Sequence, residues 1–313
     1  MSESSDPFAC FDSDDDEAPA VTASSQQQKN KDPHVIRDPS CGVLAFHRGT
    51  EQALWNYVSS EMEKSATSIP TTDLPGAVLK AIDTFCYQRH WMMNIGEEKG
   101  QIVTDFIQKC CVTYKEQNYK TPLVFVELGT YCGYSSIMFS KAIKDSGVPF
   151  HLFSVEVVKE NAQVAEKLIS LAGLDKDISV LLLDTKQESL ESLLRATFYE
   201  KLSSQDTSTQ QSQMKVDLLF IDHDKDLYLK DLRDLEQCSL VRKGCYVAAD
   251  NVVFAKIDAY RDHMKELAGL GIIQTELKES RLEYCDPDLS DKNIQPEQLI
   301  DGVGKWCQNV ISA

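Results

Sequence analysis

Residues 126–136 read VELGTYCGYSS, where an apolar run beginning at Leu123 passes into a turn with two glycines. Gly129 and Gly133 allow the backbone to turn tightly and to approach a ligand closely. Their spacing differs from the G-x-G-x-x-G pattern of dinucleotide-binding turns, so a pyrophosphate cradle is not indicated. The motif alone is also compatible with a purely structural turn. The surrounding sequence pattern has to distinguish a ligand-binding turn from a structural one.

That pattern is an alternation of short apolar runs with amphipathic segments, which predicts an α/β fold. Unbroken apolar strands are typical of a mostly parallel sheet with helices on both faces. Ligands bind such sheets at the carboxyl ends of the strands, so the residues that follow each strand are candidates for a site. The expected strands are 123–128, 151–155, 178–183, 216–221 and 245–249, and the expected helices lie near 134–145, 159–172, 187–200 and 226–240.

The remaining segments complete a single domain. Helices are expected after Gly49 and near 75–89 and 99–114, and Gly173 is expected to end a helix. Runs at 272–277 and 303–307 would form an edge pair of strands around a loop at 286–300, and 201–215 reads as a polar insertion. The predicted organisation is a disordered tail (1–40) and one domain (41–313), which divides into a helical cap (41–115) and a Rossmann-like core (116–313).

Composition narrows the classes of partner. The chain has 313 residues and a net charge of −17, and such an acidic chain repels nucleic-acid backbones. Its ten cysteines form no C-x-x-C pair and are expected to be reduced thiols. With no apolar run of membrane-spanning length and no signal peptide in the sequence, we expect no membrane partner and a cytoplasmic location.

The first forty residues are rich in acids, Ser and Gln, and no Lys or Arg precedes Lys29. Such a composition predicts disorder. Two interpretations stay open: a solubilising tail, or a docking segment that contacts an unknown protein through Phe8 and Phe11.

The second strand ends at Glu156, and an acid at this position can accept hydrogen bonds from both ribose hydroxyls of a nucleoside. A glycine turn without a pyrophosphate pattern, followed by such an acid, favours a nucleoside that carries no phosphates. S-adenosylmethionine is one. A solvated acid at a strand end is the alternative.

Three oxygen donors follow the fourth and fifth expected strands. Asp222 ends the run 216–221, while Asp250 and Asn251 follow 245–249. Carboxylate and amide oxygens suit a hard cation, and Mg²⁺ takes a few of them together with water or substrate oxygens. The alternative is that these residues cap helices. His223 is expected to orient the loop or to contact the cofactor.

Lys225 lies three residues after Asp222, at the start of the next helix. A divalent cation nearby disfavours an ammonium group, so the pKa of Lys225 should fall. We therefore expect Lys225 to be a general base for a hydroxyl group; an ordinary exposed lysine is the alternative.

Several long motifs in the same order resemble catechol O-methyltransferase over roughly residues 74–285. They are AIDTFCYQRHWMMNIGEEKGQIV (81–103), VELGTYCGYSS (126–136), LFIDHDKDLYL (219–229), VRKGCYVAADNV (241–252) and RLEY (281–284). The resemblance implies a seven-stranded Rossmann-like sheet with an antiparallel last strand. It also implies Mg²⁺-assisted methyl transfer from S-adenosyl-L-methionine to a catechol hydroxyl, in catecholamine metabolism.

The resemblance also implies a role for each matching residue. Lys225 and Glu283 would be catalytic, and Asp222, Asp250 and Asn251 would hold the metal. Trp91 would form a wall of the substrate pocket, where Lys225, Asn251 and Glu283 also contact the substrate. The cofactor would contact Met93, Asn94, Ile95, Glu127, Gly129, Tyr131, Gly133, Ser135, Glu156, Asp222 and His223.

Three positions depart from the family pattern. Asp224 replaces a tryptophan that shields the adenine, Ala255 a proline gatekeeper, and Lys186 a serine that contacts the adenine. These changes bear on substrate identity. Alternatives are therefore a related enzyme for another phenol or vicinal diol, and a non-catalytic interaction protein that retains the fold. An NAD-linked oxidoreductase is disfavoured by the glycine spacing.

Overall fold

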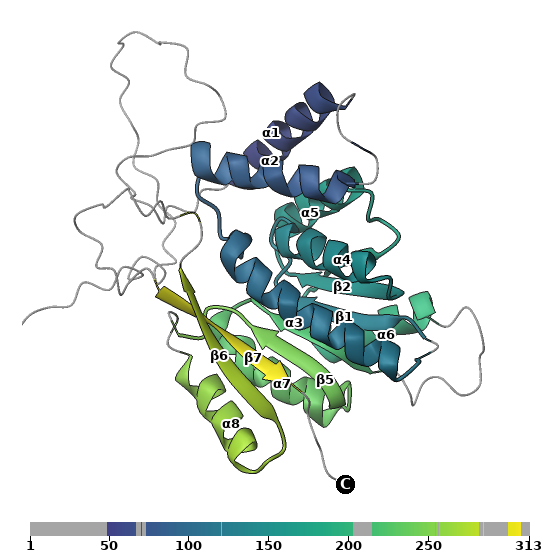
Figure 1. Cartoon of the computed structure of the whole chain (residues 1–313), viewed down its shortest axis with the longest axis vertical. Helices are drawn as coiled ribbons and strands as arrows, with labels where there is room; N and C mark the ends of the chain where they lie inside the picture. Colours follow the sequence, from purple (N-terminus) through teal and green to yellow (C-terminus); the bar gives the residue numbers. More distant parts are fainter. Residues whose placement is uncertain are drawn as a thin grey trace, which may run out of the picture. The chain divides into compact units, whose positions relative to one another are not determined.

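The computed structural model describes residues 49–66, 70, 73–119, 121–202, 215–253, 255, 257–281, 284 and 300–307 (Figure 1). The expected acidic tail (1–40), Glu283, nearly all of the insertion 201–215 and the loop up to residue 299 lie outside the described residues. Among the helices of these ranges, none combines the length and the apolar composition that a membrane span requires.

The central sheet has the strand order β3-β2-β1-β4-β5-β7-β6. The first five strands of that order are mutually parallel, and β7 pairs antiparallel with both β5 and β6. The strands are β1 (Leu123–Leu128), β2 (Phe150–Glu156), β3 (Ile178–Leu182), β4 (Val216–Ile221), β5 (Val241–Ala249), β6 (Gln274–Arg281) and β7 (Ile300–Cys307). The order reverses between β1 and β4, where a doubly wound sheet opens a crevice for a ligand.

Helices cover both faces of the sheet, as Figure 1 shows. They are α1 (Thr50–Ser65), α2 (Leu74–Gln88), α3 (Gly96–Glu116), α4 (Tyr134–Ser146), α5 (Lys159–Leu171), α6 (Leu190–Leu202), α7 (Tyr228–Gln237) and α8 (Asp258–Gly269). The sheet has a hydrophobic core on each face. In one core the helices α1, α2, α3, α4 and α5 pack against alternate strand residues such as Phe125. In the other, α6, α7 and α8 pack against strand residues such as Val126. Because successive strand residues point to opposite faces, β1 is buried along its whole length.

The predicted α/β class with a parallel sheet is confirmed, and most predicted elements agree within a few residues. α5 ends before Gly173, which adopts the left-handed conformation expected of a helix stop (φ 69°). The helix α8 is not among the predicted elements. The predicted edge pair is confirmed, because β6 and β7 pair with each other at one edge of the sheet, with β7 next to β5.

β5 begins four residues earlier than predicted. Its register against β4 shifts between Val216 and Leu218, and Gly244 has a φ of 89°. A bulge inserts residues into one strand, and glycine adopts the required positive φ without steric strain. The apolar pattern therefore breaks at this point although the strand continues.

Candidate functional site

The glycine turn between β1 and α4 is fixed by its backbone. Gly129 has a φ of 99°, and a Cβ atom there would lie 2.3 Å from the backbone oxygen of Asp222. Only glycine therefore lets the turn lie against the end of β4. Gly133 (φ 85°) precedes the first residue of α4, and Tyr131 has a positive φ of 46° although it is not glycine. Such strain at a non-glycine residue often marks a functional turn.

Glu156 is held in place at the end of β2. Its Oε2 accepts from the backbone N–H of Tyr131 (2.7 Å), and its Oε1 accepts from those of Val157 (2.9 Å) and Val158 (2.8 Å). Burial raises the pKa of Glu156, although these backbone hydrogen bonds oppose the shift. The carboxylate thus ties the glycine turn to the end of β2.

Glu127 is fully buried in β1 and accepts hydrogen bonds from the hydroxyls of Ser136 and Ser154. Burial raises its pKa to about 7, while the nearby hydroxyls of Ser135, Ser136 and Ser154 oppose the shift. Its other oxygen, Oε1, is buried and has no hydrogen-bond partner among the described residues. A buried acceptor of this kind fits the ammonium group of an amino-acid ligand.

The segment between α2 and α3 carries the other predicted cofactor contacts. The side chain of Met93 is 45% exposed, whereas Asn94 and Ile95 are buried, and Trp91 is half-buried. An exposed methionine between buried neighbours is not part of the core. Asn94 donates from Nδ2 toward Cys86 Sγ and the Tyr284 hydroxyl, both at 3.4 Å.

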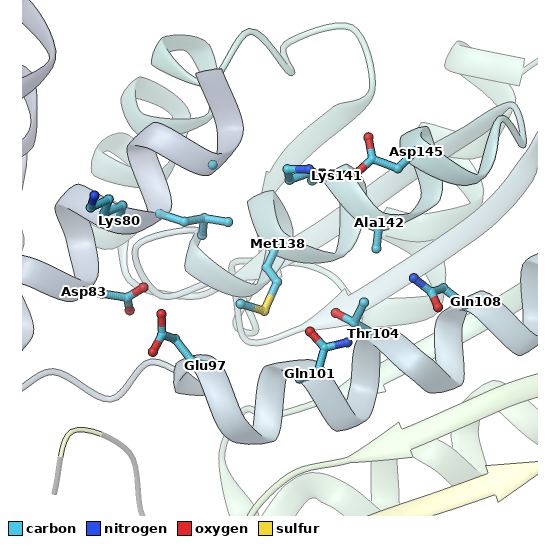
Figure 2. Close-up of a pocket in the computed structure, with 12 residues that line it drawn as sticks. Lys80, Asp83, Glu97, Gln101, Thr104, Gln108, Met138, Lys141, Ala142 and Asp145 are labelled. Atoms are coloured by element: carbon cyan, nitrogen blue, oxygen red, sulfur yellow. Dashed lines mark hydrogen bonds and ion pairs between the residues drawn. The ribbon is translucent and has the colours of Figure 1, made fainter. Parts of the chain in front are cut away.

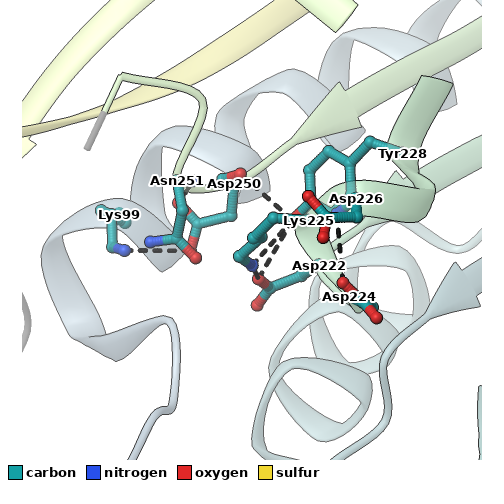
Figure 3. A network of polar contacts seen from close by, with 8 residues as sticks. All are labelled: Lys99, Asp222, Asp224, Lys225, Asp226, Tyr228, Asp250 and Asn251. Carbon is teal, nitrogen blue, oxygen red and sulfur yellow. Dashed lines mark hydrogen bonds and ion pairs between the residues drawn. The ribbon is translucent and has the colours of Figure 1, made fainter. Parts of the chain in front are cut away.

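The end of β4 brings Asp222, Lys225 and Tyr228 together (Figure 3). Lys225 begins a short 3₁₀ turn (Lys225–Leu227) that leads into α7. Its Nζ donates to Asp222 Oδ1 (2.7 Å) and to the Tyr228 hydroxyl (2.8 Å). Tyr228 in turn donates to the backbone oxygen of Asp250 (3.2 Å) and so links this group to the end of β5.

The end of β5 is held by a buried ion pair. Lys99 in α3 donates to Asp250 Oδ2 at 2.9 Å, and the two side chains are only 1% and 2% exposed. Asp250 Oδ1 accepts from the backbone N–H of Asn251 (2.7 Å), whose φ is 57°. Figure 3 shows Asp250 and Asn251 between Lys99 and the Lys225 group. Both oxygens of Asp250 are thus oriented by the protein.

The predicted metal ligands have suitable chemistry. In the part of the chain that the structure describes, no group of three or more His, Cys, Asp or Glu side chains is placed to hold a metal ion. The predicted ligands Asp222, Asp250 and Asn251 are not a group of that kind, because they are two carboxylates and one amide. Asp222 and Asp250 follow paired strands and share Tyr228 as a neighbour, and oxygen donors of these kinds fit Mg²⁺.

His223 is oriented by α7. Its Nε2 lies 3.0 Å from Asp231 Oδ2, and its ring stacks on Tyr228 at 5.2 Å. Burial raises the pKa of Asp231, but the hydrogen bonds from His223 and Lys230 outweigh that effect and the pKa is lowered. His223 Nδ1 is buried and has no hydrogen-bond partner among the described residues.

The departures from the family pattern lie at exposed or partly exposed positions. Asp224 is exposed and accepts from the backbone N–H of Asp226 (3.1 Å), so it caps the turn that holds Lys225. Lys186 is exposed and Ala255 is partly buried. No bulky side chain replaces the tryptophan that the family has at position 224.

A separate groove of about 490 Å³ lies between α2, α3 and α4 (Figure 2). Its wall includes Asp83, Glu97, Met138 and Lys141, and none of the predicted site residues. The cofactor and metal candidates therefore lie elsewhere, at the carboxyl edge of the sheet.

Sequence reasoning missed three residues that organise this edge. Lys99 occupies the apolar face of α3, four residues before Val103 and seven before Phe106. A lysine on a core-facing stripe is a detectable signal. Tyr228 and Tyr284 gave no such signal, because nothing in the spacing says where their hydroxyl groups point.

A Rossmann-like sheet with a glycine turn, an acid at the end of β2 and a buried acceptor in β1 defines the class of S-adenosylmethionine-binding methyltransferases. The sequence model of the O-methyltransferase family matches residues 76–291. The chain belongs to this O-methyltransferase family.

Relatives agree with that assignment. The chain is 32% identical to mouse catechol O-methyltransferase over 210 residues, which cover 67% of this chain and 68% of that protein. It is 29% identical to the bovine enzyme over 191 residues, which cover 61% of this chain and 60% of that one. The chain thus spans less than two thirds of the bovine relative. A structure of an O-methyltransferase from Bacillus cereus in complex with S-adenosylhomocysteine is 15% identical, with a TM-score of 0.46 over 82% of this chain and 99% of that one.

Proposed function

We propose that this protein transfers a methyl group from S-adenosylmethionine to a hydroxyl of a small catechol-like molecule, with Lys225 as the general base. The observation that carries the proposal is the position of Lys225 Nζ, 2.7 Å from Asp222 and joined through Tyr228 to Asp250. An amine beside oxygen donors, at the sheet edge where ligands bind, suits proton removal from a hydroxyl held there.

The residues of the first two strands would bind the methyl donor. Glu127 Oε1 would accept from the donor's ammonium group, and Glu156 would accept from its ribose hydroxyls. Gly129 would keep the backbone close to the ligand, and the exposed thioether of Met93 would lie near the sulfonium. Trp91, half-buried beside this segment, would bound the substrate pocket.

In the reaction, Lys225 in its neutral form takes the proton from the substrate hydroxyl. A bond forms between that oxygen and the methyl carbon, and the carbon–sulfur bond breaks. The electron pair stays on sulfur, which becomes a neutral thioether, and the proton remains on Lys225. The protein holds the oxygen in line with the sulfur–methyl bond, because such alignment removes much of the entropic barrier.

Asp222, Asp250 and Asn251 would hold Mg²⁺. When bound, the ion would lower the pKa of a coordinated hydroxyl. Lys99 holds Asp250 ready for this role. Glu283, which lies outside the described residues, would hold a second substrate hydroxyl, as the resemblance implies.

A related enzyme for another phenol or vicinal diol is the second candidate. The exposed Asp224 favours it, because an aspartate stands where the resemblance implies a tryptophan that shields the adenine. We also assign β6 and β7 to a seven-stranded sheet with an antiparallel last strand. A cytosolic location, the single-domain boundaries and a partner for the acidic tail stay predictions.

The direct test uses the full chain with a radiolabelled methyl donor and a panel of catechols and other phenols. We expect label transfer to at least one vicinal dihydroxy compound with Mg²⁺, and loss of transfer with a chelator. Asp222→Ala should abolish turnover as well. Equal transfer with and without the chelator would end the metal proposal, and no transfer to any hydroxyl compound would favour the non-catalytic interaction protein.

A further inference from the structure

One face of α2 contacts both Asn94 and Tyr284, which lie far apart in the sequence. Asp83, Cys86 and Tyr87 share this face, because residues three and four apart on a helix are neighbours. Asp83 Oδ1 accepts from the Tyr284 hydroxyl at 2.9 Å, and the Tyr284 ring packs edge-to-face on Tyr87 at 5.1 Å. Cys86 Sγ lies 3.4 Å from Asn94 Nδ2.

The Tyr284 hydroxyl lies between Asp83 and Asn94. It donates to the carboxylate of Asp83 and accepts from Asn94 Nδ2 at 3.4 Å. Because a hydroxyl has one proton, donation to Asp83 leaves its lone pairs for Asn94. The amide N–H₂ of Asn94 is therefore directed to Tyr284 and Cys86, and the orientation of the amide is fixed.

The backbone of Tyr284 indicates that this arrangement is held against strain. Its φ is 54°, in the left-handed region that non-glycine residues seldom adopt. Residues persist in such conformations where surrounding contacts over-determine them, and here the side chain is anchored at both its hydroxyl and its ring.

Asp83 is an unusual residue for this helix face. It is only 8% exposed, and Figure 2 shows its carboxylate at one end of the groove, near Glu97. Burial raises its pKa to about 6, with the nearby hydroxyls of Tyr134 and Tyr284 opposing the shift and the negative charge of Glu97 adding to it. The buried carboxylate therefore has the Tyr284 hydroxyl as its hydrogen-bond donor.

The geometry points to Asp83 as a positioning residue that acts through Tyr284 to set the orientation of Asn94, and thereby the seating of the methyl donor. This inference rests on the proposed function, together with the contact between Asn94 and the methyl donor that the family resemblance implies. It adds two residues, Asp83 and Tyr284, to which the sequence analysis gave no role.

Binding of S-adenosylhomocysteine to the full chain, measured by calorimetry, tests the inference without any turnover. Tyr284→Phe keeps the ring but removes the hydroxyl, and should weaken binding on the order of tenfold. Asp83→Leu should weaken it similarly, because Tyr284 loses its acceptor. Asp83→Asn keeps an acceptor oxygen and should stay within about threefold of the wild type. Tyr119→Phe, which removes an exposed hydroxyl elsewhere, is the matched control.

The double variant Asp83→Leu/Tyr284→Phe should bind no more weakly than either single variant, because one chain of contacts is broken twice. Unchanged binding by Tyr284→Phe, or equal weakening by Asp83→Asn and Asp83→Leu, overturns the inference. If Asp83→Leu does not fold, Tyr284→Phe and Asp83→Asn still decide. A wild-type chain that fails to bind S-adenosylhomocysteine overturns the proposed function as well, whereas normal wild-type binding with unaffected variants overturns only the positioning role.

Discussion

The ends of β4 and β5 each present an aspartate paired with a lysine, yet the two pairs differ in burial. At β5, the side chains of Lys99 and Asp250 are 1% and 2% exposed, and the lysine comes from α3. At β4, the side chains of Lys225 and Asp222 are 31% and 17% exposed, and the lysine follows three residues along the chain. Tyr228 touches both ends.

The difference in burial between the two pairs distinguishes a structural role from a role in the reaction. A fully buried ion pair cannot exchange its proton with a ligand or with water readily, but it can fix the position of Asp250 and of Asn251 beside it. A partly open pair can be separated at low energetic cost, because an exposed pair contributes only about 0–1 kcal/mol. We therefore expect Lys99 to matter for the fold and Lys225 for the reaction.

Replacing Lys225 tests the open pair and should have the largest effect. We expect Lys225→Ala to lower kcat by roughly 10² to 10⁴, the range for loss of a general base, since no other group then takes the proton. Single-turnover methyl transfer measures the change, and calorimetry with S-adenosylhomocysteine should show cofactor affinity within about threefold of the wild type.

The same variant should unfold in denaturant within about 1 kcal/mol of the wild type. An unchanged kcat would remove Lys225 from the role of base. A large loss of stability would mean that the two pairs are alike and that burial does not distinguish them.

Replacing Lys99 tests the sealed pair. Lys99→Met leaves the Asp250 carboxylate buried without its ammonium partner, and this should lower the free energy of unfolding by about 3–5 kcal/mol. Chemical denaturation at pH 7.5 measures it. The double variant Lys99→Met/Asp250→Asn removes both charges and should recover much of that stability while staying inactive. A Lys99→Met variant as stable as the wild type would contradict the structural role of Lys99.

Much of this contrast could be predicted from sequence. Strand ends follow from apolar runs, so Asp222, Asp250 and Asn251 were expected at one edge before any coordinates, and β1 and β4 have the predicted bounds. The turn glycines were likewise predicted, because few other residues tolerate a positive φ. At Gly129, moreover, a Cβ atom would lie 2.3 Å from the backbone oxygen of Asp222.

The partners of these residues could not be predicted in the same way. Lys99 lies 151 positions before Asp250, and Tyr284 lies 201 positions after Asp83. Such pairings depend on how helices pack on the sheet, which periodicity does not specify. The start of β5 was missed for a local reason, since the bulge near Gly244 interrupts the apolar pattern.

Asp83 extends the comparison of the two aspartate–lysine pairs, because this buried carboxylate accepts a hydrogen bond from a tyrosine hydroxyl and not from an ammonium group. Its pKa is raised to about 6, so folding is favoured while Asp83 is protonated and this contribution is lost as the pH rises from about 4 to 6. Asp83→Asn should therefore stabilise the protein by about 1–3 kcal/mol at pH 8, relative to its effect at pH 4. Thermal unfolding at both pH values measures the difference, with Asp145→Asn as the exposed control. An equal gain in stability of Asp83→Asn at pH 4 and at pH 8 would contradict the prediction that Asp83 becomes a buried charge at high pH.

Glu127 is the second carboxylate held by hydroxyl groups, and it should make cofactor binding depend on pH. Burial raises its pKa to about 7, and an ammonium group at Oε1 would favour the ionised form. The affinity for S-adenosylhomocysteine should therefore rise about tenfold between pH 6 and pH 8, because a proton must leave Glu127 before the contact forms. Calorimetry in buffers of different ionisation enthalpy should show proton release at pH 6.5. Glu127→Gln should bind more weakly and lose most of this pH dependence. Binding by the wild type that is constant from pH 6 to 8 would mean that Glu127 does not receive the ammonium group, and that the raised pKa at this position reflects burial alone.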